Sequence, residues 1–307
     1  MSSKARGNFQ RPDHVVVAIG GNALQDRGKK LNISHQKENV AAAISSLKPL
    51  LEMHKVTIVH GNGPQVGYLA LIDKQSPLDI LDAESEGMIG YLLEQEIINH
   101  LSDENRHGTA TVLSQMVVDP KDPAFDDPTK FVGPQYSNEQ EAQNALKSGH
   151  ILKRDGSYLR RVVPSPKPKY LIENQLIALK HLVENDCIVI CAGGGGVPVF
   201  RDPMSGQLSG VEAVIDKDLS AAMIATAIEA NGLLILTDVR GVAIHYGDTR
   251  KEKWIKSISP DVLATFMNHF MPGSVRENFL FYLRALFIIF SKQYFQITTI
   301  VCFSTVR

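Results

Sequence analysis

The chain has 307 residues, of which 44% are hydrophobic and 21% are charged, the balance of a globular protein that buries a sizeable core. Its formal net charge of -1 leaves no overall basic surface, so we expect no nucleic-acid partner. The cysteines are few and odd in number, which argues against a disulfide framework and favours a reducing, cytoplasmic compartment. No apolar stretch has the character of a signal peptide or the length of a membrane span, so we expect neither export nor a membrane partner.

Strands and helices alternate along the first part of the chain. Apolar β-branched runs predict strands, and apolar residues at helical spacing predict helices. The expected elements are a strand at His14–Ile19, a helix at Lys37–Met53, a strand at Val56–Val59, helices at Pro64–Ile72 and Glu84–Leu101, and a strand at Ala110–Val118. The acids of Glu84-Ser85-Glu86-Gly87 are interpreted as favourable charges at a helix start, with no catalytic role.

The alternation stops at about residues 119–168, which are rich in Pro, Asp, Lys and Gly. A stretch of this length inside a compact domain is typically either functional or disordered, and we interpret this one as a lid or small subdomain. Beyond it the expected elements are a helix at Leu171–Val183, a strand at Cys187–Cys191, a helix after Asp216-Lys217-Asp218 and a strand at Gly232–Leu236. Strand runs without alternation, separated by helices, predict an α/β fold with a mostly parallel sheet covered on both faces. No repeat or linker divides the chain, so we expect one domain over residues 14–307.

Loops of small residues follow four of the expected strands. They are Gly20-Gly21-Asn22, Gly61-Asn62-Gly63, Gly193–Gly196 and Thr237-Asp238. Ligands of an open parallel sheet bind beyond the carboxyl ends of the strands, so these loops should converge on one crevice. Glycine lets the backbone approach a phosphate closely, and helix N-termini offer free N–H groups. Tight-turn chemistry would explain one such loop, whereas four of them favour a phosphate site. No GxGxxG or Walker motif is present, which weighs against a dehydrogenase and a P-loop NTPase.

The segment Asp216-Lys217-Asp218 stands where a loop enters a helix. Such a segment is either a solvated cluster of charges on the surface or a site where the lysine neutralises the charge of a phosphate. The apolar run before it places the segment at the active edge of the sheet, where Lys217 would contact a transferring phosphoryl group and Asp218 would orient it. Lys130, on the expected lid, is either solvated or turned toward the same site. A phosphate oxygen that acts as nucleophile is already ionised, so the chemistry needs no general base.

Taken together, these segments resemble the carbamate kinases, a branch of the amino-acid-kinase family. The matching text is AIGGNAL at 18–24, VHGNGPQVG at 59–67, AESEGMIGYLLEQ at 83–95, VVDPKDPAFDDPTKFVG at 117–133, RRVVPSPKP at 160–168, CAGGGGVPV at 191–199, GVEAVIDKD at 210–218 and LTDV at 236–239. The resemblance runs in collinear order from about residue 14 to about residue 274. Acetylglutamate, isopentenyl-phosphate and uridylate kinases share the sheet and glycine loops, but the PSPKP and DPTK segments argue against them.

The resemblance implies a three-layer αβα sandwich with a small protruding lid, assembled as a homodimer. Its implied reaction is the reversible transfer of a phosphoryl group from carbamoyl phosphate to ADP with Mg²⁺, as in arginine fermentation. The residues implied in catalysis are Lys217, Asp218, Lys130 and Asn22. Those implied in binding carbamoyl phosphate or the transferred phosphoryl group are Gly20, Gly21, Gly61, Asn62, Gly194 and Gly195. Those implied beside the nucleotide are Asp216, Thr237 and Asp238, and no residue is assigned as a direct metal ligand.

The C-terminal segment 275–307 departs from the family pattern. Where the family has a lysine that contacts the nucleotide phosphates, no lysine follows Gly273-Ser274 at the corresponding place. The segment is rich in aromatic residues and contains no Asp, Gly or Pro. Two interpretations stand side by side: a frameshifted or mis-spliced terminus, and an ordinary apolar helix and strand that pack on the sheet. The alternative function is therefore an impaired relative that binds nucleotide and carbamoyl phosphate without transfer.

Overall fold

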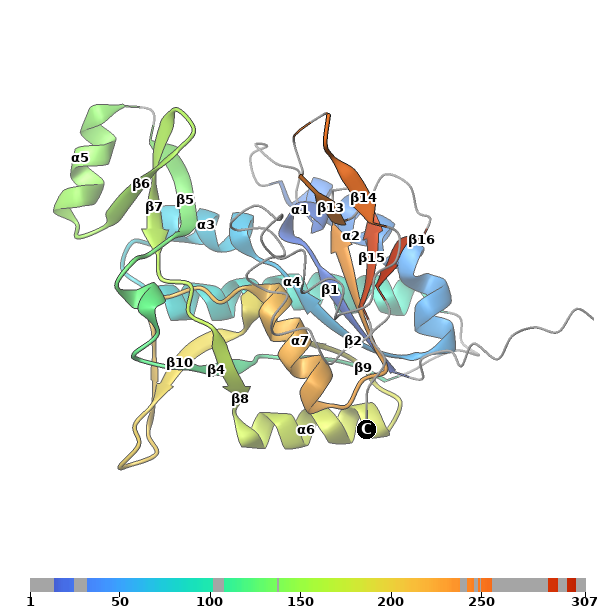
Figure 1. Ribbon diagram of the computed structural model, residues 1–307. Coiled ribbons are helices and arrows are strands. Elements are labelled where there is room, and N and C mark those ends of the chain that lie inside the picture. The colour runs from blue at the N-terminus through green and yellow to red at the C-terminus, as the bar shows by residue number, and fades with distance from the viewer. Residues whose placement is uncertain are drawn as a thin grey trace, which may run out of the picture.

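The computed structural model describes residues 14–24, 32–101, 108–136, 138–237, 242–245, 248, 250–255, 287–291 and 297–301. Within these residues a seven-stranded sheet in the order β16-β15-β12-β1-β2-β9-β3 forms the centre of the molecule (Figure 1). Its strands are β1 (His14–Ile19), β2 (Lys55–His60), β3 (Thr109–Val112), β9 (Ile188–Cys191), β12 (Gly232–Thr237), β15 (Phe287–Ser291) and β16 (Ile297–Val301). Every neighbouring pair is parallel except β15 and β16, which confirms the predicted mostly parallel sheet.

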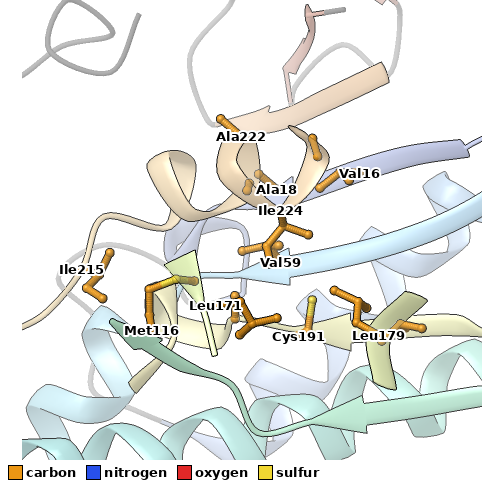
Figure 2. Packing of buried hydrophobic residues seen from close by; sticks show 14 of the residues in the cluster. Val16, Ala18, Val59, Met116, Leu171, Leu179, Cys191, Ile215, Ala222 and Ile224 are labelled. Atoms are coloured by element: carbon orange, nitrogen blue, oxygen red, sulfur yellow. The ribbon is translucent and has the colours of Figure 1, made fainter. Parts of the chain in front are cut away.

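Helices cover both faces of this sheet, which confirms the three-layer sandwich. They are α2 (Ile33–Met53) and α4 (Leu78–His100) on one face, and α6 (Glu173–Glu184) and α7 (Lys217–Ala227) on the other. Val15 and Val17 of β1 pack toward α2 and α4, whereas Val16 and Ala18 pack toward α6 and α7. Figure 2 shows the second of these clusters, with Ile224 of α7 against the sheet. Because side chains of a strand alternate between faces, two covered faces require the continuous apolar runs seen in the sequence.

Two further sheets flank the central one. A four-stranded sheet in the order β11-β10-β4-β8 contains β4 (Gln115–Val118), β8 (Pro168–Leu171), β10 (Val197–Arg201) and β11 (Leu208–Gly210). A three-stranded antiparallel sheet in the order β5-β7-β6 contains β5 (Lys130–Tyr136), β6 (Ile151–Asp155) and β7 (Tyr158–Val163), and α5 (Glu139–Lys147) packs beside it. This second unit, here called the protruding subdomain, stands out at the upper left of Figure 1. It lies within the stretch that the sequence marked as a lid.

Short elements connect these layers. They are α1 (Gly21–Leu24), α3 (Gly63–Ile72), the 3-10 turns η2 (Pro123–Phe125) and η3 (Gly193–Gly195), and the hairpin of β13 (Val242–Ile244) and β14 (Lys253–Ile255). Helix α3 ties the protruding subdomain to the body, because a Cβ on Gly67 would lie 2.9 Å from the backbone nitrogen of Gly133 in β5. Among the described residues, none of the helices combines the length and the apolar character that crossing a bilayer requires.

The structure corrects several predicted boundaries. The single strand expected at Ala110–Val118 is wrong: β3 and β4 belong to different sheets, because Ser114 between them bonds to Glu86 and Ala192 and leaves the strand ladder. The helix expected at Glu84–Leu101 begins earlier, at Leu78, so Glu86 lies mid-helix and not in a first turn. Leu171 ends β8, and α6 begins only at Glu173.

Candidate functional site

The loops after β1 and β2 meet beneath the side chain of Lys217. The N–H group of Gly61 donates to the carbonyl of Ile19 at 2.8 Å, and a Cβ on Gly61 would lie 2.8 Å from the nitrogen of Gly21. The Lys217 side chain covers both loops: its Cδ lies 3.2 Å from that Cβ position, and its Cε lies 3.8 Å from the equivalent position on Gly20. Glycine is required here because any side chain would push the two strand ends apart. The carboxyl ends of β1 and β2 thus lie together under the aliphatic part of the Lys217 side chain.

The glycine loop after β9 is the third loop at this edge of the sheet. The loops after β1, β2 and β9, together with the start of α7, are here called the crevice. Gly194 and Gly195 have φ of +69° and +105°, backbone conformations that residues with a side chain rarely adopt. A Cβ on Gly195 would lie 2.6 Å from the carbonyl oxygen of Ile215, just before α7. The Ser220 hydroxyl of α7 donates to the Gly195 carbonyl at 2.6 Å. The loop is therefore clamped against the start of α7, which carries Lys217.

Two lysines and two aspartates gather at the N-terminus of α7. Lys217 Nζ donates to Asp218 Oδ1 at 2.7 Å, and Lys130 Nζ of the protruding subdomain donates to Asp216 Oδ2 at 3.3 Å. Asp216 also caps the helix, since its Oδ1 accepts from the Asp218 N–H at 2.9 Å. Burial works to raise the pKa of Asp216, but the charges of Lys130 and Lys217 outweigh burial and hold the pKa below its ordinary value. The two ammonium groups, balanced here by carboxylates, are available to exchange them for phosphate oxygens.

The protruding subdomain is anchored to the segment that leads into α7. Arg161 of β7 forms an ion pair with Glu212, and the Val214 N–H donates to the Pro164 carbonyl at 3.0 Å. The guanidinium carbon of Arg160 lies 5.4 Å from the centre of the Phe131 ring. These contacts place Lys130, the first residue of β5, over the crevice edge.

Sequence reasoning missed two buried acids beneath the crevice, Asp82 and Glu86 of α4. They share a helix face with the buried Ile89 and Leu93, and this i, i+4, i+7 spacing was the available signal. Asp82 accepts a hydrogen bond from Asn62, and Glu86 accepts one from the Gly193 N–H at 2.8 Å. The side chain of Asn62 thus points inward, and only its backbone can face the crevice.

Two of the predicted site residues are partly covered by the structure, and a third is not covered. Asn22 lies in α1, but its side chain is outside the described part, as is that of Thr237 at the end of β12. Asp238 falls wholly outside the described residues. The end of β12 does border the site, because the Gly20 N–H donates to the Leu236 carbonyl at 3.3 Å.

The sequence of the chain matches those of known carbamate kinases over most of its length. The profile of the amino acid kinase family matches residues 13–277, so the C-terminal segment lies largely beyond the match. The chain is 46% identical over 258 residues to a carbamate kinase of Escherichia coli, covering 82% of this chain and 83% of that protein. It is 42% identical over 279 residues to a carbamate kinase of Pyrococcus horikoshii, covering 86% and 87%.

The fold of the chain also matches that of a carbamate kinase whose structure has been solved. The carbamate kinase from Giardia lamblia bound to AMP-PNP superposes with a TM-score of 0.82 at 33% identity, covering 95% of this chain and 99% of that one. The likeness therefore extends over the sheet, the glycine loops and the protruding subdomain together. The chain belongs to the amino acid kinase family, in its carbamate kinase branch.

Proposed function

We propose that the chain transfers the phosphoryl group of carbamoyl phosphate to ADP, forming ATP and carbamate in a reversible reaction. The observation that carries this proposal is the position of Lys217, which begins α7 and lies across Gly20 and Gly61 at the carboxyl ends of two parallel strands. The relatives named above are carbamate kinases that align over most of their length. A Giardia relative of the same fold holds an ATP analogue.

The proposed mechanism rests on positioning and charge. An ionised β-phosphate oxygen of ADP attacks the phosphorus, a P–O bond to ADP forms, and carbamate leaves with the electron pair of the broken bond. Lys217 and Lys130 neutralise the charge that gathers on the transferring phosphoryl oxygens, with Asp218 orienting Lys217. No proton has to be removed from the nucleophile, so the absence of a general base from the proposal is consistent with the chemistry. Gly20, Gly21, Gly61, Asn62, Gly194 and Gly195 supply backbone that approaches the phosphates.

We further propose that the nucleotide enters as its Mg²⁺ complex, beside Asp216, Thr237 and Asp238. Within the described part of the chain, no group of three or more His, Cys, Asp or Glu side chains could hold a metal. Mg²⁺ fits such a site, because it commonly binds one or two carboxylates together with substrate phosphates and water. Asp216 and Asp218 are the carboxylates beside Lys217 that would contact it. When bound, the ion would neutralise phosphate charge.

The direct test is ATP formation by the purified protein from ADP, Mg²⁺ and carbamoyl phosphate. Sustained turnover that stops when EDTA is added is the expected result. Folded protein that binds ADP but forms no ATP would instead support the impaired relative, whose cause would then be sought in segment 275–307. Protein that binds neither substrate would contradict both.

Lys130→Ala is expected to raise the KM for carbamoyl phosphate by roughly 10- to 100-fold, because a charged hydrogen bond contributes about 1.5–3 kcal/mol. The nearby Lys130–Asp216 ion pair shows that its ammonium reaches the edge of the crevice from the protruding subdomain. Steady-state kinetics with varied carbamoyl phosphate measures the effect. Lys153→Ala is the matched control, since Lys153 lies in the same small sheet but pairs with Asp127. Equal KM values for the two variants would remove Lys130 from the site.

We also propose that the chain forms a homodimer through α4. Ile80, Tyr91 and Ile98 are 47%, 58% and 57% exposed, and Gly87 between them has open space above it. Their spacing is close to whole helical turns, so they form one apolar stripe along the outer face of the helix. A second copy of the same stripe is the simplest complementary surface, as in an isologous two-fold interface.

Tyr91→Glu is therefore expected to convert a dimer into a monomer, because it places a charge in the middle of the stripe. Light scattering coupled to size-exclusion chromatography measures the mass. Met204→Glu is the control, since Met204 is 95% exposed on the turn between β10 and β11. A wild-type monomer, or a dimer that survives Tyr91→Glu, would contradict this interface.

A further inference from the structure

Two carboxyl groups lie in the protein interior beneath the crevice, one turn apart on α4. Asp82 and Glu86 are 0% and 1% exposed. Burial raises the pKa of Asp82 to about 7 and that of Glu86 well above its ordinary value, and the negative charge of Asp82 raises the Glu86 pKa further. Burying carboxyl groups destabilises a fold unless hydrogen bonds compensate. We therefore ask which parts of the chain the hydrogen bonds of these two carboxyl groups hold in place.

Asp82 sets the orientation of Asn62. The amide nitrogen of Asn62 donates both to Asp82 Oδ1 and to the Ser85 hydroxyl, the latter at 2.8 Å. Asn62 stands at the N-cap position of α3, yet its side chain makes no capping bond. The Asn62 amide instead bonds to α4, and this contact holds the loop after β2 against the helix.

Glu86 holds two more loops. Its Oε1 accepts from the Gly193 N–H at 2.8 Å, and both of its oxygens lie 3.3 Å from the Ser114 nitrogen. The Ser114 hydroxyl in turn accepts from the Ala192 N–H at 2.7 Å. The loops after β3 and β9 are thus joined to each other and to the same helix face.

The loops held by these acids also contact each other directly. A Cβ on Gly194 would collide with the side-chain amide of Asn62, so the loops after β2 and β9 pack without a gap. Phosphoryl transfer depends on placing backbone and lysine groups closely, and a shift of about 1 Å costs on the order of 10²-fold in rate. Movement of either loop would be transmitted to the other.

We propose that Asp82 and Glu86 are positioning residues of the phosphoryl-transfer site, holding the loops after β2 and β9 at the spacing that phosphate binding needs. Neither carboxyl is exposed to substrate, so each acts through the loop that it bonds. This inference rests on the proposed function, because it concerns the same crevice. Nothing in the described geometry gives these acids a direct part in bond making.

Paired variants of Asp82 test the proposal. Asp82→Ala removes the acceptor for Asn62 and is expected to lower kcat for ATP formation by about 10²-fold per folded molecule. Asp82→Asn keeps an oxygen at the same place and should restore most of that loss. Glu84→Ala is the control, because Glu84 is exposed on the same helix and should leave kcat unchanged. Asn62→Ala added to Asp82→Ala should cost little more, since both remove one interaction.

Variants of Glu86 and Ser85 extend the test. Glu86→Gln keeps one acceptor for Gly193 and should retain more activity than Glu86→Met, which keeps none. If Asp82→Ala does not fold, Ser85→Ala removes only one hydroxyl beside Asn62 and should still lower kcat severalfold. Thermal unfolding is followed in parallel for every variant. Loss of stability with unchanged kcat and KM in the folded fraction would overturn the proposal, because that pattern belongs to a purely structural role.

Failure of the proposed function is separable from failure of this inference. If the wild-type chain forms no ATP, ADP binding measured by calorimetry becomes the readout. Asp82→Ala should then weaken ADP binding by about tenfold, and Asp82→Asn should not, because the loops still cradle phosphate. Equal ADP affinities in wild type and Asp82→Ala would overturn the positioning role.

Discussion

Lys217→Met is expected to lower kcat for ATP formation by about 10³-fold or more, because in the proposed mechanism Lys217 neutralises charge on the transferring phosphoryl group. The side chain is 19% exposed and lies across Gly20 and Gly61, so no bulk water would replace its charge efficiently. Methionine preserves the length of the side chain and its packing on the glycines. The measurement is initial-rate ATP synthesis with saturating ADP and carbamoyl phosphate.

Lys180→Met serves as the matched control for Lys217→Met, since Lys180 is exposed on α6 and lies on no loop of the crevice. Lys180→Met should unfold near the wild-type temperature, because an exposed lysine contributes little to stability. Lys217→Met is expected to unfold at a lower temperature, because it leaves the carboxylates of Asp216 and Asp218 without the charge of Lys217, so its turnover is measured per folded molecule. Near-normal turnover of Lys217→Met would contradict the proposed role of this lysine in phosphoryl transfer. It would also move the centre of the reaction away from the start of α7.

Gly195→Ala is expected to destabilise the protein by about 3 kcal/mol or more and to abolish activity in what remains folded. Two effects add. The φ of +105° is a conformation that residues with a side chain rarely adopt, and the new methyl group would lie 2.6 Å from the Ile215 carbonyl oxygen. The methyl group can avoid that contact only if the glycine loop moves away from the start of α7, which carries Lys217.

Gly206→Ala separates backbone strain from steric overlap in this comparison. Gly206 has a φ of +74° but no atom within 4 Å of its Cβ position, so its substitution should cost only about 1 kcal/mol. Urea unfolding of both variants gives the two free energies, and ATP synthesis gives the activity of the folded fraction. Similar losses for the two glycines would mean that contact with Ile215 does not hold the loop.

Local pattern alone predicted the mostly parallel sheet covered on both faces and the glycine loops at the ends of its strands. Continuous apolar runs such as His14–Ile19 specify strands buried on both faces, and they lie where the pattern placed them. Gly20, Gly61 and Gly195 follow such strands, and parallel strands bring their carboxyl ends to one edge. The position of Lys217 at the start of a helix was also predictable, because an apolar run precedes the segment Asp216-Lys217-Asp218.

Contacts between residues far apart in the sequence decided several element boundaries and the way the glycine loops are held. A local sequence pattern does not encode such contacts. Helix α4 begins at Leu78 because Glu212 accepts its N–H at 2.9 Å across a separation of 134 residues. The strand predicted at Ala110–Val118 divides because Glu86 binds the Ser114 N–H. The helical spacing of Asp82 and Glu86 could indicate a buried face, but not the partners of these acids, because Asn62 and Gly193 come from distant parts of the chain. Hydrogen bonds of this kind form only after the chain has packed, so only the tertiary structure shows what holds the glycine loops in place.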